Sequence, residues 1–179
     1  MLQADNAALV IVDIQGKLAS LMYQKEIFYD NVVRMIKGAR LLNIPIIWNE
    51  QLPDKLGATI EPIKSELSDL HPLVKKSFSC CGNPDFVKRL KATGRKQVLL
   101  TGMETHICVF QTAVDLLDAG YEVHLVTDAV ASRFEHNYRV GIERIKDHGA
   151  IVTSTEMALF EMFDIAEGPQ FKELVKIVK

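Results

Sequence analysis

A carboxylate, a cation and a thiol lie where predicted strands end or helices begin. Asp13 directly follows an apolar run at 8–12, and Cys108 lies shortly after a second apolar run at 98–102. Burial at a strand end would raise the pKa of Asp13 toward that of a useful base. The first turn of a helix would lower the pKa of the Cys108 thiol. The two residues therefore predict a nucleophile with a neighbouring base, although an aspartate can also cap a turn and a free cysteine can pack as a small apolar side chain.

Lys75 supplies the cation. It lies in the stretch 73–78, which has the pattern of a strand directed into the interior. A buried ammonium without an anionic partner is unfavourable, so Asp13 or a thiolate is the expected neighbour. Lys76 would point to the opposite face of the strand, so only one of the two lysines can face the site.

Alternating apolar runs and helical patterns must position these groups. The predicted strands are 8–12, 46–48, 73–78, 98–102, 123–127 and 150–153, and the predicted helices are 26–42, 63–70, 84–94, 106–117, 132–148, 157–163 and 171–178. Strands separated by helices predict an α/β fold, a three-layer αβα sandwich with a six-stranded parallel sheet. Ligands of such sheets bind beyond the carboxyl ends of the strands, where Asp13 and Cys108 lie.

Composition limits the other possibilities. The 179 residues fit a single domain spanning 1–179, and 48% of them are hydrophobic. A net charge of −2 argues against a nucleic-acid partner. No apolar stretch approaches the roughly 20 residues of a membrane span, and no secretory signal is visible, so a cytoplasmic protein is expected.

The remaining cysteines and histidines give weaker signals. Cys80 and Cys81 are adjacent and belong to no Cys-x-x-Cys pair, so they predict packing or a redox role rather than a disulfide framework. His106 lies two residues before Cys108, a spacing that points the two side chains apart on a helix. The other four histidines show no metal-ligand spacing.

Three segments together resemble the isochorismatase-like cysteine hydrolase superfamily, which includes nicotinamidases and N-carbamoyl amidohydrolases. Residues 8–15 are similar to its first-strand motif with a catalytic Asp, and 75–79 to its pattern of Lys, two residues, an aromatic residue and Ser. Residues 101–109, with 112–113 and 120–123, are similar to its nucleophile segment. The resemblance covers nearly the whole chain and implies an isochorismatase-like (Rossmann-like) hydrolase fold.

The resemblance also implies a catalytic triad of Asp13, Lys75 and Cys108 that acts through a covalent thioester. It implies a cis peptide at Met103–Glu104 and an oxyanion hole formed by the N–H groups of Glu104 and Cys108. The residues assigned to a substrate pocket are Gln15, Gln51, Phe78 and Met103.

Departures from the superfamily narrow the expected activity. The metal motif Asp-x-His of nicotinamidases is missing from 48–53, so no metal and no cofactor are predicted. The presence of Cys108 favours amide or other acyl chemistry over the thiol-free isochorismatase reaction. Dimers or tetramers are common in the superfamily, and the apolar stretch at 157–163 is expected to lie in an interface between copies of the chain.

Three hypotheses remain open at this stage. The first is a metal-independent cysteine hydrolase that acts on a small amide, carbamoyl or related compound. The second is a non-catalytic binding or assembly module that retains the hydrolase fold. The third is a thiol redox protein that uses Cys80, Cys81 or Cys108.

Overall fold

Six parallel strands form one sheet in the order β3-β2-β1-β4-β5-β6. The computed structural model describes residues 1–163 and 165–179. The strands are β1 (Ala7–Val12), β2 (Ile46–Gln51), β3 (Leu73–Lys75), β4 (Gln97–Met103), β5 (Glu122–Ala131) and β6 (Ile151–Thr153). The order reverses between β1 and β4, and the predicted six-stranded parallel sheet is confirmed.

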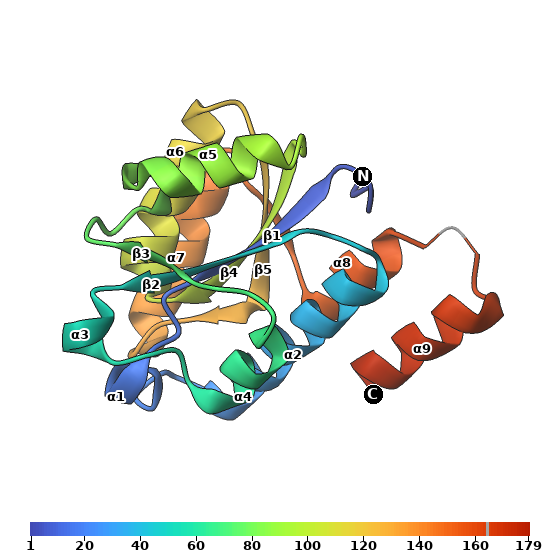
Figure 1. Cartoon of the computed structure of the whole chain (residues 1–179), viewed down its shortest axis with the longest axis horizontal. Helices are drawn as coiled ribbons and strands as arrows, with labels where there is room; N and C mark the ends of the chain where they lie inside the picture. Colours follow the sequence, from blue (N-terminus) through green and yellow to red (C-terminus); the bar gives the residue numbers. More distant parts are fainter. Residues whose placement is uncertain (164) are drawn as a thin grey trace.

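Helices cover both faces of the sheet (Figure 1). One face carries α2 (Lys25–Leu41), α8 (Thr155–Glu161) and α9 (Gly168–Val178), and the other carries α5 (Pro84–Ala92), α6 (Phe110–Asp118) and α7 (Glu135–Asp147). Short helical turns lie in the connections: α1 (Gly16–Ala19), α3 (Pro53–Leu56) and α4 (Glu61–Lys64), the 3₁₀ turns Ser65–Leu67 and Cys80–Gly82, and a π-turn at Thr105–Val109. The architecture is the predicted three-layer sandwich.

The central strand β1 shows why the sheet needs both layers. All six of its residues are buried. Its odd-numbered residues, such as Leu9 and Ile11, belong to the core under α2, whereas Val10 and Val12 belong to the core under α5 and α6. A strand with two apolar faces is stable only where helices cover both of them.

Strand β2 continues to Gln51, three residues beyond its predicted end. Two further strands also differ from the prediction by three or more residues. The third ends at Lys75 rather than at residue 78, because the carbonyls of Ser77 and Phe78 turn back to accept hydrogen bonds from the Lys75 ammonium. The fifth continues to Ala131, four residues beyond the predicted end, and its register against β4 shifts between Leu100 and Gly102. Neither difference was visible from apolar periodicity.

The C-terminal apolar stretch is largely covered within the chain. Leu159 is fully buried, and the rings of Phe160 and Phe163 pack edge-on against Phe171 of α9. Helix α9 therefore covers part of this stretch, and its place in an interface between copies of the chain stays a prediction. Met157 remains well exposed.

A close approach of β4 to β1 defines the switch point. Gly102 pairs with Val12 and has a φ of 142°. A Cβ atom at Gly102 would lie 2.4 Å from the Val12 carbonyl oxygen, so glycine is required there. The residues just beyond these two strand ends are Asp13 and Glu104.

Candidate functional site

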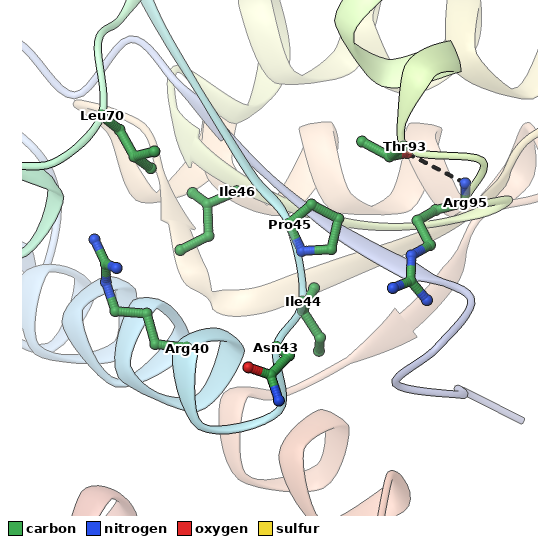
Figure 2. Close-up of a pocket in the computed structure, with 8 residues that line it drawn as sticks. All are labelled: Arg40, Asn43, Ile44, Pro45, Ile46, Leu70, Thr93 and Arg95. Atoms are coloured by element: carbon green, nitrogen blue, oxygen red, sulfur yellow. Dashed lines mark hydrogen bonds between the residues drawn. The ribbon is translucent and has the colours of Figure 1, made fainter.

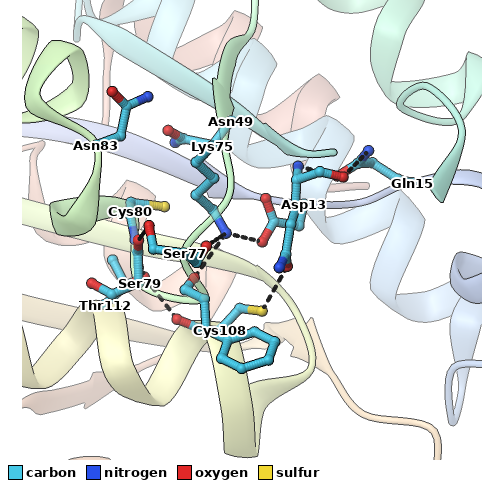
Figure 3. Close-up of polar contacts among 12 residues, drawn as sticks. Asp13, Gln15, Asn49, Lys75, Ser77, Ser79, Cys80, Asn83, Cys108 and Thr112 are labelled. Atoms are coloured by element: carbon cyan, nitrogen blue, oxygen red, sulfur yellow. Dashed lines mark hydrogen bonds and ion pairs between the residues drawn. The ribbon is translucent and has the colours of Figure 1, made fainter. Parts of the chain in front are cut away.

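Asp13 and Lys75 form a buried ion pair at the carboxyl edge of the sheet (Figure 3). The Lys75 Nζ lies 2.5 Å from Asp13 Oδ2 and also donates to the carbonyls of Ser77, at 3.0 Å, and Phe78, at 2.8 Å. Both charged residues are only 2% exposed. Lys76 is exposed, so Lys75 rather than its neighbour pairs with Asp13.

Cys108 faces this ion pair from the turn that follows β4 (Figure 3). It is 6% exposed, and its thiol donates a hydrogen bond to Gln51 Oε1 at 3.5 Å. The Cys108 carbonyl accepts a hydrogen bond from Thr112 Oγ1, which itself accepts the N–H of Cys80. The structure thus brings together the three groups that the sequence had placed at separate strand ends.

The pKa of Cys108 moves in the direction opposite to the prediction. Burial of the thiol, followed by the nearby charge of Asp13, raises this pKa to about 12. The expected lowering by a helix N-terminus was wrong, because Cys108 lies inside a π-turn and α6 begins only at Phe110. Cys108 therefore rests as a thiol, and a thiolate at this position would require a base.

Asp13 has the properties of that base. Burial raises the pKa of its carboxyl above the ordinary value, against the opposing effects of the Lys75 charge and its hydrogen bond. Its second oxygen, Oδ1, is buried and has no hydrogen-bond partner among the described residues. A carboxylate with one oxygen fixed by a cation and the other unoccupied can accept a proton.

Left-handed backbone follows three neighbouring strands at this edge. Asp13, Leu52 and Glu104 come directly after β1, β2 and β4, with φ angles of 54°, 41° and 57°. Such conformations are unfavourable for side chains other than glycine and concentrate at functional sites. The predicted cis peptide at Met103–Glu104 was wrong, since the described residues contain none, and Glu104 makes the turn through its positive φ instead.

The Glu104 side chain was assigned no role from the sequence. In the structure it holds the turn Thr105–Val109, which carries Cys108. Its Oε1 accepts a hydrogen bond from Arg133 Nε at 2.6 Å, and its Oε2 lies 3.3 Å from His106 Nδ1. Its carbonyl accepts the N–H groups of Ile107 and Val109, which flank Cys108. Burial lowers the pKa of His106, which also contacts the Ser132 hydroxyl at 3.0 Å.

Gly141 of α7 supports the same turn from outside. A Cβ atom at this position would lie 2.9 Å from both the His106 nitrogen and the Thr105 carbonyl carbon. Arg133 and Gly141 both lie far from Cys108 in the sequence, in the segment 132–148, whose pattern predicted only a helix; α7 begins at Glu135, so Arg133 lies before it. The sequence therefore contained no local signal for either of them.

The four residues assigned to a substrate pocket lie in different environments. Gln15 is fully buried and binds backbone, because its amide nitrogen donates to the Gly57 carbonyl and its oxygen accepts the N–H of Gln51. Met103 packs in the core under α2. Gln51 contacts the thiol, and Phe78 is 51% exposed in the loop that holds Lys75. Only Gln51 and Phe78 therefore remain available to a ligand.

The other two cysteines, like Cys108, are held as protonated thiols by burial. Burial raises the pKa of Cys80 far above its usual range and that of Cys81 to about 11. No disulfide is formed, and the side chain of Cys80 is completely buried. These surroundings do not favour the redox hypothesis.

A cavity of about 510 Å³ lies at the opposite edge of the sheet, away from Cys108 (Figure 2). Its lining includes Arg40 and Arg95 around the apolar residues Ile44 and Ile46. Arg40 is already paired with Asp69. The C-terminal ends of α2 and α5 come together here, so their partial negative charges oppose the binding of an anion. The cavity therefore offers no reactive group that could act with Asp13, Lys75 and Cys108.

Metal ligation has no support from the side chains that the structure places. Over residues 1–163 and 165–179, no group of three or more His, Cys, Asp and Glu side chains could hold a metal ion. The metal-free and cofactor-free site stays a prediction.

Comparison with known proteins identifies the family. The isochorismatase domain model matches residues 7–157. The chain is 37% identical to the "Secreted isochorismatase effector Isc1" of Phytophthora sojae over 179 residues, which covers 97% of this chain and 85% of that protein.

Two solved structures extend the similarity to the fold. One, described as the MAR1 ribonuclease of Caenorhabditis elegans, is 35% identical with a TM-score of 0.92, covering 99% of this chain and 91% of that one. The other is Escherichia coli YcaC, described as an octameric hydrolase of unknown specificity; it is 26% identical with a TM-score of 0.92, covering 98% of this chain and 89% of that one. The family model matches most of the chain, and both solved structures have the same architecture as this protein. This chain therefore belongs to the isochorismatase family and has the hydrolase fold of that family.

Proposed function

We propose that the chain is a cysteine hydrolase of small amide or carbamoyl compounds, in which Cys108 is the nucleophile and Asp13 the general base. The observation that supports this assignment is the buried Asp13–Lys75 ion pair beside a protonated thiol. A fully desolvated ion pair is not an effective way to stabilise a fold. Its position at the switch point of the sheet therefore favours a catalytic role.

In the first step, Asp13 takes the thiol proton as the Cys108 sulfur attacks the carbonyl carbon. The S–C bond forms while the carbonyl electron pair moves onto oxygen. Because the pKa of Cys108 is raised to about 12, proton transfer accompanies the attack rather than preceding it. Lys75 keeps Asp13 oriented and stabilises its charged form.

In the next step, the tetrahedral oxyanion collapses. The N–H groups of Glu104 and Cys108 are the proposed donors to this oxygen, and the Glu104–Arg133 contact holds the turn that carries both. The C–N bond breaks, and the amine leaves with the proton that Asp13 received. The product of this half-reaction is a thioester on Cys108.

Hydrolysis of the thioester restores the enzyme. Asp13 removes a proton from water, the hydroxyl oxygen attacks the thioester carbon and the C–S bond breaks. The departing sulfur recovers the proton from Asp13 as the acid is released. Gln51, which contacts the thiol, and the exposed ring of Phe78 are the proposed contacts for the substrate.

The assignment is tested by turnover and by intact mass. The protein is incubated with a panel of small primary amides and N-carbamoyl compounds, and ammonia release and acyl adducts are measured. We expect Cys108→Ser to abolish turnover and Asp13→Asn to reduce it by about 10²–10⁴-fold. Cys81→Ser is the matched control and should behave as the wild type. Turnover that survives Cys108→Ser, or that a chelator abolishes, would contradict the proposal.

The same experiment distinguishes the alternative of a binding module. A protein without a catalytic role would bind small molecules, yet form no adduct and release no ammonia. The C. elegans neighbour also makes RNA worth including as a substrate. We expect no cleavage of RNA, because the chain has a net charge of −2 and its thiol is suited to acyl rather than phosphodiester chemistry.

Association and location complete the proposal. We expect the chain to form a homodimer or homotetramer, an idea supported by exposed apolar side chains such as Met157 and Phe134 and by the octameric E. coli neighbour. No helix in the described part of the chain is long and apolar enough to cross a membrane. A cytoplasmic location stays a prediction, because a relative is described as secreted.

A further inference from the structure

A second cavity, of about 350 Å³, lies beside the carboxyl end of β2. Its lining includes Glu50 and Trp48 from the strand, and Lys64, Leu67, Leu70 and His71 from the segment that leads to β3. Successive residues of a strand point to opposite faces. Gln51 faces Cys108, so Glu50 points to the other side of the sheet. The cavity is therefore separate from the proposed catalytic centre.

Glu50 is the unusual feature of this cavity. The residue is 5% exposed, yet its carboxylate forms no ion pair within the described residues. Its Oε1 accepts hydrogen bonds from the Thr59 N–H and hydroxyl, each at 2.7 Å. Its Oε2 receives no such bond from the residues the structure places, and it is not sealed from water. A buried carboxylate favours a cationic partner, and here the open oxygen borders the cavity.

The remaining lining has a definite polarity. The indole N–H of Trp48 is already committed to Thr59 Oγ1, at 2.8 Å, so the ring offers the cavity only an apolar surface. Leu70, which is partly exposed, continues this surface, and Leu67 is fully buried at its edge. Lys64 and His71 are exposed, which places the basic groups at the mouth and the carboxylate at the base.

We propose that this cavity binds a small free amino acid. The ammonium group would meet Glu50 Oε2, the side chain would lie on Trp48 and the leucines, and the carboxylate would face Lys64 at the mouth. A simple amine has no partner for the basic rim. A simple carboxylate brings a like charge toward Glu50, which is unfavourable at low exposure. Binding at this cavity does not depend on turnover at Cys108, so it can be tested separately from the proposed hydrolase activity.

The fluorescence of Trp48 reports directly on this cavity, because the chain contains a single tryptophan. Its indole is connected to the Glu50 carboxylate through the Thr59 hydroxyl. The protein is titrated with glycine, leucine and phenylalanine. Leucine is compared with isopentylamine, which lacks its carboxylate, and with 4-methylpentanoate, which lacks its amine. We expect a saturable change with leucine, weaker binding of isopentylamine and no binding of 4-methylpentanoate.

Variants assign the response to particular groups. Glu50→Gln retains an acceptor for Thr59 and should weaken leucine binding by about tenfold or more, the effect of losing one charge-assisted contact. Lys64→Ala lies on the surface, where it should not disturb folding, and should weaken leucine binding without affecting isopentylamine. Glu61→Gln and Lys55→Ala are the matched controls, and thermal unfolding verifies that every variant is folded.

Three results would overturn the inference. One is the absence of a saturable fluorescence change with all three amino acids up to about 10 mM, a concentration above the dissociation constants of most specific complexes. Another is equal binding of leucine and 4-methylpentanoate. The third is a leucine affinity that neither Glu50→Gln nor Lys64→Ala alters.

Discussion

Replacing Lys75 by methionine should destabilise the fold more than any other single loss of a lysine charge, and the effect should grow with pH. The Lys75 ammonium is fully buried and donates to Asp13 and to two backbone carbonyls, so its removal leaves three acceptors without their donor. Removing one partner of a buried ion pair costs about 3–5 kcal/mol. For a domain of this length, each kcal/mol lowers Tm by about 2–4 °C, so the expected fall is about 6–20 °C.

The pH dependence follows from Asp13. In the wild type, burial already raises the pKa of Asp13 above the ordinary value, although Lys75 opposes this shift. Replacing Lys75 removes its two lowering effects, so the pKa of Asp13 rises further; burial and the Glu50 charge then raise it against only the hydrogen bond with Cys108. The folded variant then binds a proton at Asp13 more tightly than the unfolded chain does. Its stability is therefore greatest below the ordinary pKa of Asp and is lost as the pH rises through the raised value.

Urea unfolding at about pH 5 and about pH 8 measures both effects, since the free-energy loss caused by Lys75→Met should be larger at the higher pH. Lys76→Met is the matched control, because Lys76 is exposed and adjacent. A double variant, Asp13→Asn with Lys75→Met, should recover part of the loss by removing the unpaired charge. The reasoning is refuted if Lys75→Met is no more destabilising than Lys76→Met, or if its free-energy loss is the same at both pH values.

Three further predictions concern the turn Thr105–Val109, which carries Cys108. Without substrate at about pH 7, Cys108 should react with iodoacetamide more slowly than a model thiol, because its pKa is raised to about 12; faster labelling of Cys108 than of the model thiol would contradict this. Glu104→Gln should remove one of the charges that raise this pKa and speed labelling by less than about tenfold, and an unchanged or lower rate would argue against the coupling. Gly141→Ala should cost about 1–3 kcal/mol by forcing α7 away from the turn, measured by urea unfolding, and a neutral effect would show that the turn can yield.

The arrangement of the sheet was predictable because a strand that is buried on both faces appears in the sequence as a short run of consecutive apolar residues. The fully apolar β1 and the apolar residues of β4 predicted central strands, and the parallel order followed from the helices between them. Asp13 and Lys75 were identifiable because burying an unpaired charge is unfavourable. A charged residue inside such a run, or at its end, therefore indicates a partner or a function. Strand alternation showed that only one of Lys75 and Lys76 can face the site, and the resemblance of 75–79 to the family pattern selected Lys75.

Features that depend on distant contacts were not predictable. The Cys108 pKa follows from burial against Asp13 and from a π-turn, whereas local spacing indicated an ordinary helix start. Gln15 looked like a ligand contact at a strand end, but it binds the backbone of Gly57 and Gln51. Arg133 reaches Glu104 from the predicted helix 132–148, whose pattern contained no sign of this contact.

The sequence by itself determined the layered α/β architecture and the edge at which the reactive residues gather, because local periodicity specifies which faces are buried and strand ends specify which residues emerge. The tertiary structure alone decided the protonation of the thiol, the partners of Glu104 and the carboxylate at the base of the second cavity. These properties arise from desolvation and from charges contributed by segments far apart in the chain, and no window of neighbouring residues contains them.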